Sequence, residues 1–372
     1  MEILISFIIP FIILLTVVVF IHEYGHYYYA KKYGVGVTDF SIGFGKEIFG
    51  FNDKSGMRWK FCLIPLGGYV KFFGDRNVFS YAEQNELLKK YSANEQKKLF
   101  LTKPLYQRSI ILAAGPFANF ILAIVIFAFL NMFVGKDFTP AKIKEVQKDG
   151  PAYVAGIKSG DIVMSIDNKK IQSLLEVSQQ INASTEDEMK IIVSRGNDEI
   201  SFALIPNKIE SSDAFGNKVN KRIIGIKFSP LEGEIDRQKL GPTKAIFYAV
   251  KETWFVIHAS WDFVVNAVQG KADINQLGGP VKIAKISGDV AKLGLVPFLT
   301  IMAYISVSIG FINLLPIPLL DGGHLAFNLF EKILGRPLSK RVQDGFFRIG
   351  LFLLFSLMFF TTYNDLRNLG LF

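Results

Sequence analysis

Four long apolar segments constrain the fold of this chain more than any other feature. They cover residues 3–21, 109–133, 296–315 and 346–363. Each is long and apolar enough to cross a lipid bilayer as a helix, in which every backbone polar group is satisfied within the segment. Hydrophobic residues make up 50% of the chain, which is high for a soluble protein. We therefore predict a polytopic α-helical membrane protein with about four transmembrane helices.

The charged residues indicate how the chain is oriented. Basic residues are concentrated in 31–108 and 331–348, and the formal net charge is +9. By the positive-inside rule both loops face the cytoplasm and both termini face outward. The positive charge lies beside apolar segments and forms no nucleic-acid-binding module, so we expect anionic membrane lipid, and no nucleic acid, as a partner. No basic stretch precedes the first apolar segment, so we expect that segment to be retained rather than cleaved as a signal peptide.

A histidine pair directly follows the first apolar segment, in the sequence His22-Glu-Tyr-Gly-His26. Residues four positions apart share one face of a helix, so both imidazoles can reach one Zn²⁺ ion while Glu23 lies beside it as a base. A coincidental pair of interfacial histidines is the alternative. Ionisable groups at membrane depth are costly and usually functional, which favours the metal site.

A catalytic zinc site commonly uses three protein ligands, so one more is required. The sequence Asn313-Leu-Leu-Pro-Ile-Pro-Leu-Leu-Asp-Gly-Gly-His324, at the end of the third apolar segment, supplies Asp321. Its two prolines end a helix and its glycines allow a tight turn, so the Asp321 carboxylate can face the bundle interior. We expect the first and third apolar helices to pack together and complete the site.

The segment 135–240 is polar, with short alternating apolar stretches and turn residues. Within it, the sequence from Gly150 to Asp167 resembles a PDZ domain of the bacterial protease type. PDZ domains bind extended peptides by adding them as a strand at a sheet edge. A β-rich spacer with only a structural role is the alternative.

The segment 241–295 follows, and within it residues 245–268 are apolar but interrupted by charged residues. This pattern indicates an amphipathic helix at the membrane interface. We expect His258 on that helix to be an interfacial or packed histidine rather than a metal ligand. The single cysteine, Cys62, excludes an intramolecular disulfide and is expected to be a small packed side chain.

Several motifs together resemble the site-2 protease family of intramembrane zinc metalloproteases, most closely its bacterial RseP type, over nearly the whole chain. The matching segments are His22-Glu-Tyr-Gly-His26, Gly43-Phe-Gly45, Ile64-Pro-Leu-Gly-Gly-Tyr-Val-Lys71, Gly115-Pro-Phe-Ala-Asn119, the PDZ-like segment, and Asn313 through Gly323. The best-known enzymes of this type carry tandem PDZ domains, whereas 135–240 has room for a single PDZ-like domain. A size filter built from two such domains is therefore not expected here.

The resemblance implies roles for individual residues. His22, His26 and Asp321 would bind zinc. Glu23 would be the catalytic acid/base, and Asn313 is a candidate for positioning substrate or stabilising the oxyanion. For His324, next to the Asp-Gly motif, we expect a role at the start of a helix or behind the ligands rather than coordination.

The same resemblance implies a membrane-associated β element at 57–73, beside the site. We expect a turn at 65–68 and a free strand edge that pairs with an unwound substrate. The residues expected to bind substrate are Gly67, Gly68, Tyr69 and Val70. A hairpin that only packs against the helices is the alternative.

We predict two membrane parts, 1–134 and 296–372, around the inserted domain and the interfacial region. The predicted protein is an inner-membrane zinc metalloprotease of a bacterium, with its active site near the cytoplasmic side and the PDZ-like domain outside the cytoplasm, where it binds a peptide or protein. Its expected substrates are single-span membrane proteins, such as anti-sigma factors, or remnant signal peptides.

Two other functions compete with this prediction. A non-catalytic membrane scaffold with a structural zinc site would not need the glutamate at position 23. A zinc transporter would need polar residues along a path through the bilayer, whereas these are concentrated at one end of the helices. Both are therefore disfavoured.

Overall fold

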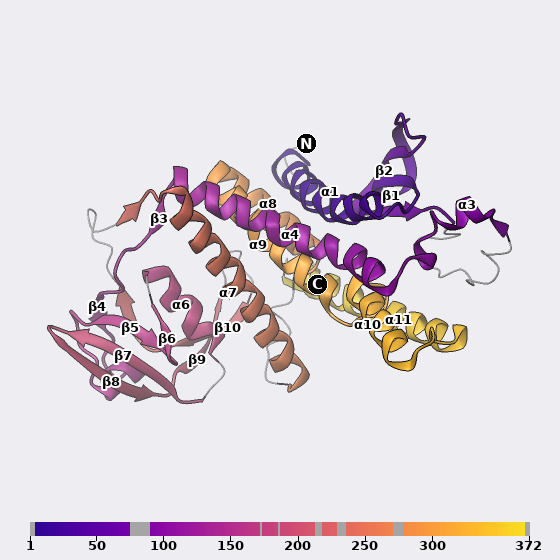
Figure 1. Ribbon diagram of the computed structural model, residues 1–372. Coiled ribbons are helices and arrows are strands. Elements are labelled where there is room, and N and C mark those ends of the chain that lie inside the picture. Colours follow the sequence, from indigo (N-terminus) through magenta and orange to yellow (C-terminus); the bar gives the residue numbers. More distant parts are fainter. Residues whose placement is uncertain are drawn as a thin grey trace. The chain divides into compact units, whose positions relative to one another are not determined.

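The computed structural model describes residues 4–74, 90–171, 173–184, 187–212, 218–228, 236–270 and 278–368. The chain divides into two compact units. One unit consists of Met1–Ile126 and Gly279–Tyr363, and the other of Phe127–Gly278 and Asn364–Phe372. The first is mostly helical and the second contains most of the strands (Figure 1).

Long helices dominate the first unit, although α4 and α11 extend beyond it. The helical elements are η1 (Leu4–Ile8, a π-helical turn), α1 (Ile9–Lys32), α3 (Ala93–Gln96), η2 (Phe100–Thr102), α4 (Leu105–Phe133), α8 (Pro280–Lys292), α9 (Leu295–Leu314), α10 (Asp321–Leu334) and α11 (Lys340–Asn368). Among the described residues, four helical stretches are long and apolar enough to cross a membrane: Ile5–Lys32, Leu105–Phe133, Leu295–Leu314 and Arg341–Arg367. The prediction of about four such helices is confirmed.

The helix α1 is longer than the apolar segment suggests. It continues to Lys32, beyond the apolar segment 3–21, so His22 lies inside the helix, about three turns before its end. A Cβ added at Gly25 would lie 2.3 Å from the carbonyl oxygen of Ala114, so this glycine allows α1 and α4 to pack closely. The helix ends where Gly34 adopts a φ of 68°, which glycine tolerates without strain.

A β element follows α1, made of β1 (Val37–Asn52) and β2 (Arg58–Phe72), which pair antiparallel. Phe40 of β1 pairs with both Val70 and Trp59, so the first half of β1 lies between two parts of β2. Phe40 is fully buried and its ring stacks on that of Trp59 at a centroid distance of 4.5 Å. This packing holds the last part of β2 in a defined position next to α1.

Residues 65–68 are assigned to strand β2, but Ile42 of β1 pairs with both Phe61 and Gly68. β2 therefore reverses direction between these two residues, in the region of the turn expected at 65–68. β1 changes direction as well, at Gly43 and Gly45, whose φ values are 90° and 85°. Such values strain any residue that has a Cβ, so the two glycines absorb the change of direction.

The second unit holds a strand-rich segment. Its elements are β3 (Lys136–Asp137), β4 (Ile143–Val146), α5 (Pro151–Ala155), β5 (Ile162–Ile166), β6 (Lys169–Lys170), α6 (Leu174–Ala183), β7 (Met189–Arg195), β8 (Asp198–Leu204), β9 (Asn207–Ser212), β10 (Lys218–Ile223), β11 (Ile226–Phe228) and β12 (Arg237–Gln238). The main sheet has the strand order β6-β5-β7-β8. The other strands form the antiparallel pairs β10–β9, β11–β4 and β12–β3.

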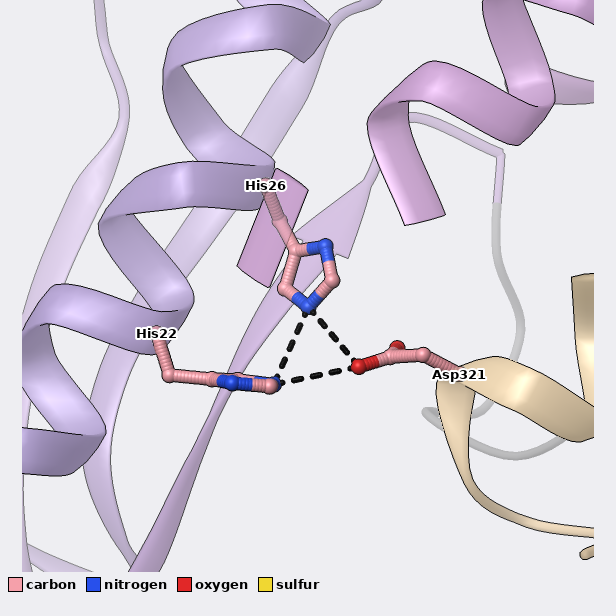
Figure 2. A group of neighbouring side chains, drawn as sticks. All are labelled: His22, His26 and Asp321. Carbon is pink, nitrogen blue, oxygen red and sulfur yellow. Dashed lines mark hydrogen bonds and ion pairs between the residues drawn. The ribbon is translucent and has the colours of Figure 1, made fainter. Parts of the chain in front are cut away.

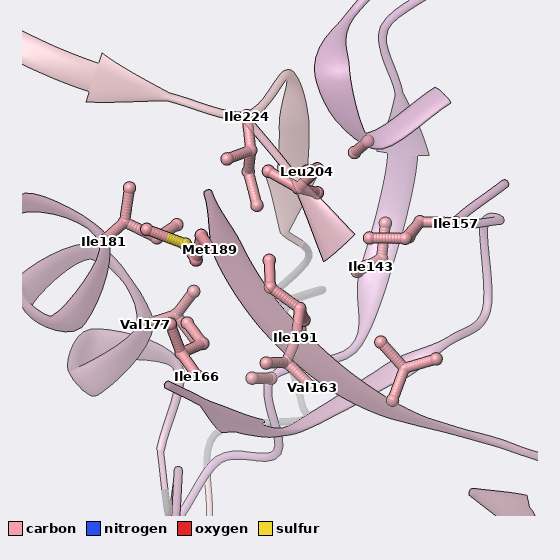
Figure 3. Packing of buried hydrophobic residues seen from close by; sticks show 13 residues of the cluster. Ile143, Ile157, Val163, Ile166, Val177, Ile181, Met189, Ile191, Leu204 and Ile224 are labelled. Atoms are coloured by element: carbon pink, nitrogen blue, oxygen red, sulfur yellow. The ribbon is translucent and has the colours of Figure 1, made fainter. Parts of the chain in front are cut away.

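The core of this segment follows from the alternation of side chains along β7 (Figure 3). Met189, Ile191 and Val193 are buried on one face, and Ile191 pairs with Ile166 of β5. Val177 of α6 belongs to the same apolar cluster. A slip of β7 by one residue would turn Met189, Ile191 and Val193 toward the opposite face of the sheet, so the apolar pattern defines the register of this strand.

One ion pair lies at the edge of this core, and its Asp161 side chain is buried while Arg195 is partly exposed. The Arg195 guanidinium donates to both carboxylate oxygens of Asp161, at 2.7 and 2.8 Å. Burial raises the pKa of Asp161, but the hydrogen bonds and charge of Arg195 outweigh that effect and hold the pKa below its usual value.

The helix α7 (Pro242–Val268) completes the second unit. It buries a row of small side chains at four-residue spacing: Ala245, Ala249 and Thr253. Its charged residues keep it outside the set of candidate membrane spans, and its location at an interface remains a prediction. The ring of His258 lies against Trp254 at 4.7 Å and belongs to none of the metal-ligand clusters found among the described residues.

Candidate active site

Three potential metal ligands from distant parts of the chain meet in the first unit (Figure 2). His22 and His26 lie one turn apart on α1, and Asp321 is the first residue of α10. The Asp321 Oδ2 atom lies 3.1 Å from His22 Nε2 and 3.4 Å from His26 Nε2. The two Nε2 atoms are 3.2 Å apart. The expectation that these residues converge is therefore confirmed.

The position of Asp321 depends on a sharp change in chain direction. The helix α9 ends at Leu314, the two prolines that follow cannot continue it, and α10 begins at Asp321. A Cβ added at Gly322 would lie 2.2 Å from the carbonyl oxygen of Leu315, so only glycine permits this close return of the backbone. The turn places the carboxylate opposite the two imidazoles.

The residues present fit a zinc ion. Two imidazole nitrogens and one carboxylate oxygen, all within 4.8 Å of one another, form a donor set that zinc prefers. Apart from its contacts with the two Nε2 atoms, the buried Asp321 Oδ2 has no hydrogen-bond partner within the described part of the chain, as expected for an atom that serves a metal. A Cβ at Gly115 of α4 would lie 2.3 Å from His26 Nε2 and 2.9 Å from His22 Nε2, so this glycine leaves the space that the rings occupy.

The electrostatics of Asp321 suit a ligand. Burial raises the pKa of its carboxyl, but the neighbouring His26 and His22 imidazoles outweigh burial and hold the pKa well below its usual value. The carboxyl is therefore ionised at neutral pH. His324, one turn further along α10, packs against the rings of Phe327 and Phe347, and burial lowers its pKa.

Glu23 lies between the histidine face of α1 and the strand β2. Its side chain is buried, and the backbone amide of Val70 interacts with its carboxylate. A Cβ added at Gly68 would lie 3.1 Å from Glu23 Cγ, so β2 passes close to this side chain. The ring of Tyr69 stacks on Phe44 at 6.2 Å. The strand expected to hold substrate therefore lies directly beside the glutamate.

Comparison with known proteins identifies the family. The sequence pattern described as peptidase family M50 matches residues 10–357. The chain belongs to peptidase family M50. This is the family of site-2 proteases that its motifs resemble, and the resemblance is therefore confirmed.

Three relatives illustrate the similarity. The chain is 40% identical over 364 residues to a protein of Agrobacterium fabrum provisionally named a zinc metalloprotease, covering 98% of this chain and 96% of the relative. A protein of Mesorhizobium japonicum with the same provisional name is 42% identical over 358 residues, covering 96% and 98%. Metalloprotease MmpA of Caulobacter vibrioides is 34% identical over 379 residues, covering 96% and 94%. This M50 member is a multi-pass membrane zinc metalloprotease.

Asn313 is not brought to the cluster of this M50 peptidase. Its Nδ2 donates to the carbonyl oxygen of Ile309, one turn earlier in α9, at 3.0 Å. In the described part of the chain no hydrogen bond joins it to His22, His26 or Asp321. A polar side chain that bonds its own helix is a common arrangement in apolar surroundings.

Two residues of α4 that contact the histidines were not predicted from the sequence. The carbonyl oxygen of Ile111 accepts a hydrogen bond from His26 Nδ1 at 2.8 Å. The side chain of Asn119 lies 3.3 Å from His22 Nδ1. A backbone carbonyl leaves no trace in a sequence, but an asparagine inside an apolar helix is costly and indicated that this position has a polar partner.

Proposed function

We propose that this zinc metalloprotease cleaves peptide bonds within the membrane-spanning segments of single-span membrane proteins, as in regulated intramembrane proteolysis. The convergence of His22, His26 and Asp321 carries the proposal, because two of these residues lie inside α1, a helix long and apolar enough to cross a membrane. We assign these three residues as the zinc ligands. A soluble protease has no reason to place its ligands on such a helix.

The chemistry would be divided among these residues. Bound zinc supplies a Lewis acid that acidifies water and polarises a peptide carbonyl. Glu23 takes the proton from the attacking water and delivers it to the leaving nitrogen. The Glu23 side chain is buried beside the ligands, so its carboxylate is shielded from bulk water and stays close to the water that it deprotonates.

The strand β2 is proposed to hold the substrate. A membrane-spanning helix conceals its peptide bonds in its own hydrogen bonds, so a cleavable segment must be unwound and kept extended. Residues 67–70 of β2 lie beside Glu23, where an added strand would place one of its peptide bonds next to Glu23 and the zinc ligands. Tyr69→Pro should lower cleavage at normal protein levels, whereas Tyr69→Phe should not.

Asn313 is proposed to stabilise the oxyanion. One of its two amide N–H groups donates to the carbonyl oxygen of Ile309, so this role would use the second N–H group. Asn313→Ala should then lower kcat with little change in KM, because the interaction forms only in the transition state. A variant with unchanged kcat would assign Asn313 to the stability of α9 alone.

The proposed orientation rests on the distribution of basic residues. Lys31, Lys32 and Arg108 near the helix ends support a cytoplasmic face for the β element, which places 135–240 outside the cytoplasm of a bacterial inner membrane. We propose that this segment is a single PDZ-like domain that binds extended peptides or proteins. Anti-sigma factors and remnant signal peptides are the two proposed substrate classes, and membrane lipid surrounds the helices.

A direct experiment uses the full-length protein purified in detergent and a tagged single-span membrane substrate. Wild type should cleave it, and removal of zinc or the substitution Glu23→Gln should abolish cleavage. Glu199→Gln, at an exposed position of β8, is the matched control and should cleave normally. Unchanged cleavage by Glu23→Gln would exclude Glu23 as the base. A wild type that binds zinc but cleaves none of a varied panel would support the alternative of a scaffold with structural zinc.

A further inference from the structure

We infer that Asn119 is a positioning residue for the zinc site, acting through His22. Asn119 lies on α4 and is 0% exposed. Its amide group lies 3.3 Å from Nδ1 of His22, the ring nitrogen that faces away from Asp321. The inference rests on the proposed role of His22 as a zinc ligand.

The other histidine shows what such a contact does. A carbonyl oxygen can only accept, so His26 Nδ1 must carry the proton that it donates to Ile111. The lone pair of that ring is then on Nε2, which faces Asp321. Ile111, Gly115 and Asn119 follow one another at four-residue spacing and therefore share one face of α4. On this face Ile111 contacts the His26 ring, Asn119 contacts the His22 ring, and Gly115 between them leaves space for both rings.

The backbone of Asn119 is held separately from its side chain. Ser306 of α9 donates its hydroxyl to the carbonyl oxygen of Asn119 at 2.9 Å. A Cβ added at Gly310 would lie 3.2 Å from Asn119 Cβ, so α9 passes this residue closely. Asparagines in apolar helices commonly bond a neighbouring helix. In Asn119 the hydrogen bond to the neighbouring helix α9 is made by the backbone carbonyl oxygen, and the side chain is directed to His22.

The chemistry of the amide matches a metal-binding imidazole. A neutral ring that gives its Nε2 lone pair to a metal carries its proton on Nδ1, and of the two polar atoms of an asparagine amide only the oxygen can accept a hydrogen bond from it. Asn119 Oδ1 is buried and lacks a hydrogen-bond partner among the described residues. A half-turn of the amide exchanges its nitrogen and oxygen, which gives Oδ1 the Nδ1 proton as its partner. The amide then fixes both the tautomer and the orientation of His22.

The test measures zinc affinity of the full-length protein in detergent by competition with a chromophoric chelator. Asn119→Leu keeps the size of the side chain but removes the acceptor, and it should weaken binding by about 10- to 100-fold, as is typical for loss of a ligand's hydrogen-bond partner. Asn119→Asp keeps an acceptor oxygen and should stay close to wild type. Asn131→Leu, on the same helix with its amide on the carbonyl oxygen of Ala245, is the matched control and should bind normally.

The outcomes distinguish a role of the Asn119 acceptor oxygen from a purely structural role. A wild-type affinity for zinc in Asn119→Leu would overturn the inference. Equal losses in the Leu and Asp variants would also overturn it, because the shape of the residue rather than its acceptor would then matter. If Asn119→Leu does not fold, Asn119→Ala and Asn119→Asp carry the comparison by the same criterion. His22→Ala separates this test from the proposed function: zinc affinity unchanged in that variant would remove His22 from the ligand set, whatever Asn119 does.

Discussion

Gly115 of α4 provides the sharpest test of the geometry of the site. In Gly115→Ala, the new methyl group would lie 2.3 Å from His26 Nε2, 2.6 Å from His26 Cε1 and 2.9 Å from His22 Nε2. An ordinary contact needs about 3.5 Å, so the His26 ring must move by about 1 Å. Metal–ligand distances tolerate only about 0.2 Å. The single added carbon is therefore expected to dismantle the ligand set.

The size of the effect follows from that displacement. A shift of about 1 Å at the reacting groups costs on the order of 100-fold in rate, which corresponds to about 2.7 kcal/mol. Stability should change little, because the gain of about 1 kcal/mol in helix propensity from glycine to alanine offsets part of the cost of displacing the buried ring, about 1–3 kcal/mol. We expect Gly115→Ala to fold normally, to bind zinc weakly and to lose at least about 100-fold in kcat/KM.

The assay combines thermal unfolding, zinc affinity and cleavage of a tagged single-span substrate in the same detergent. Gly345→Ala is the matched control, because that glycine also lies in a helix and a Cβ there meets nothing within 4 Å. The control should behave as wild type in all three measurements. If Gly115→Ala bound zinc and cleaved like wild type, the close approach of α4 to the two imidazoles would be refuted.

Three further predictions concern stability. Glu331→Gln leaves the buried Arg108 guanidinium without the carboxylate that it contacts at 2.6 Å, so the free energy of unfolding should fall by about 3 kcal/mol. A free energy of unfolding in denaturant equal to that of wild type would show that the pair contributes little. Asp161 has a lowered pKa in the folded protein, so its contribution is complete above the usual value of about 3.9 and is lost as the pH falls through the lower folded value. Protection of β7 amides from hydrogen exchange should therefore drop at acid pH, and Asp161→Asn, which weakens the bond to Arg195, should remove that dependence. Ile191→Ala leaves a cavity in the core of the strand-rich segment and should lower its stability by about 2–5 kcal/mol, with loss of protection in β7; unchanged protection would place Ile191 outside the core.

The helix α4 has a more central role than its sequence indicates. Besides its contacts with both histidines, α4 forms polar contacts with α10, the helix that begins at Asp321. Arg108 contacts Glu331 of α10, and Ser109 accepts a hydrogen bond from Asn328 Nδ2 at 3.1 Å. These polar contacts fix α10 relative to α4 in an apolar environment, where such bonds have few competitors. The three ligands are thus held in relation to one helix that supplies none of them.

Local features of the sequence were enough for the main part of the candidate site. The four-residue spacing of His22 and His26 predicts a shared helix face, and the apolar segments predict helices of membrane length. Prolines and glycines around Asp321 predict the end of α9 and the tight turn. Each of these signals depends on residues close together in the chain, which is why it can be read without tertiary structure.

The tertiary structure decided the features that depend on close approach between distant segments. The sequence predicts a turn near 65–68 of β2, but the second change of direction, at Gly43 and Gly45 of β1, is defined only by the pairing of the two strands. Asn313 bonds its own helix, whereas Asn119 reaches His22. By itself the sequence determined which groups could bind a metal and which segments could cross a membrane. Helix packing determines that the Ile111 carbonyl, Gly115 and the Asn119 amide lie next to the imidazoles. These contacts depend on how the helices cross and not on the spacing of residues along any one helix.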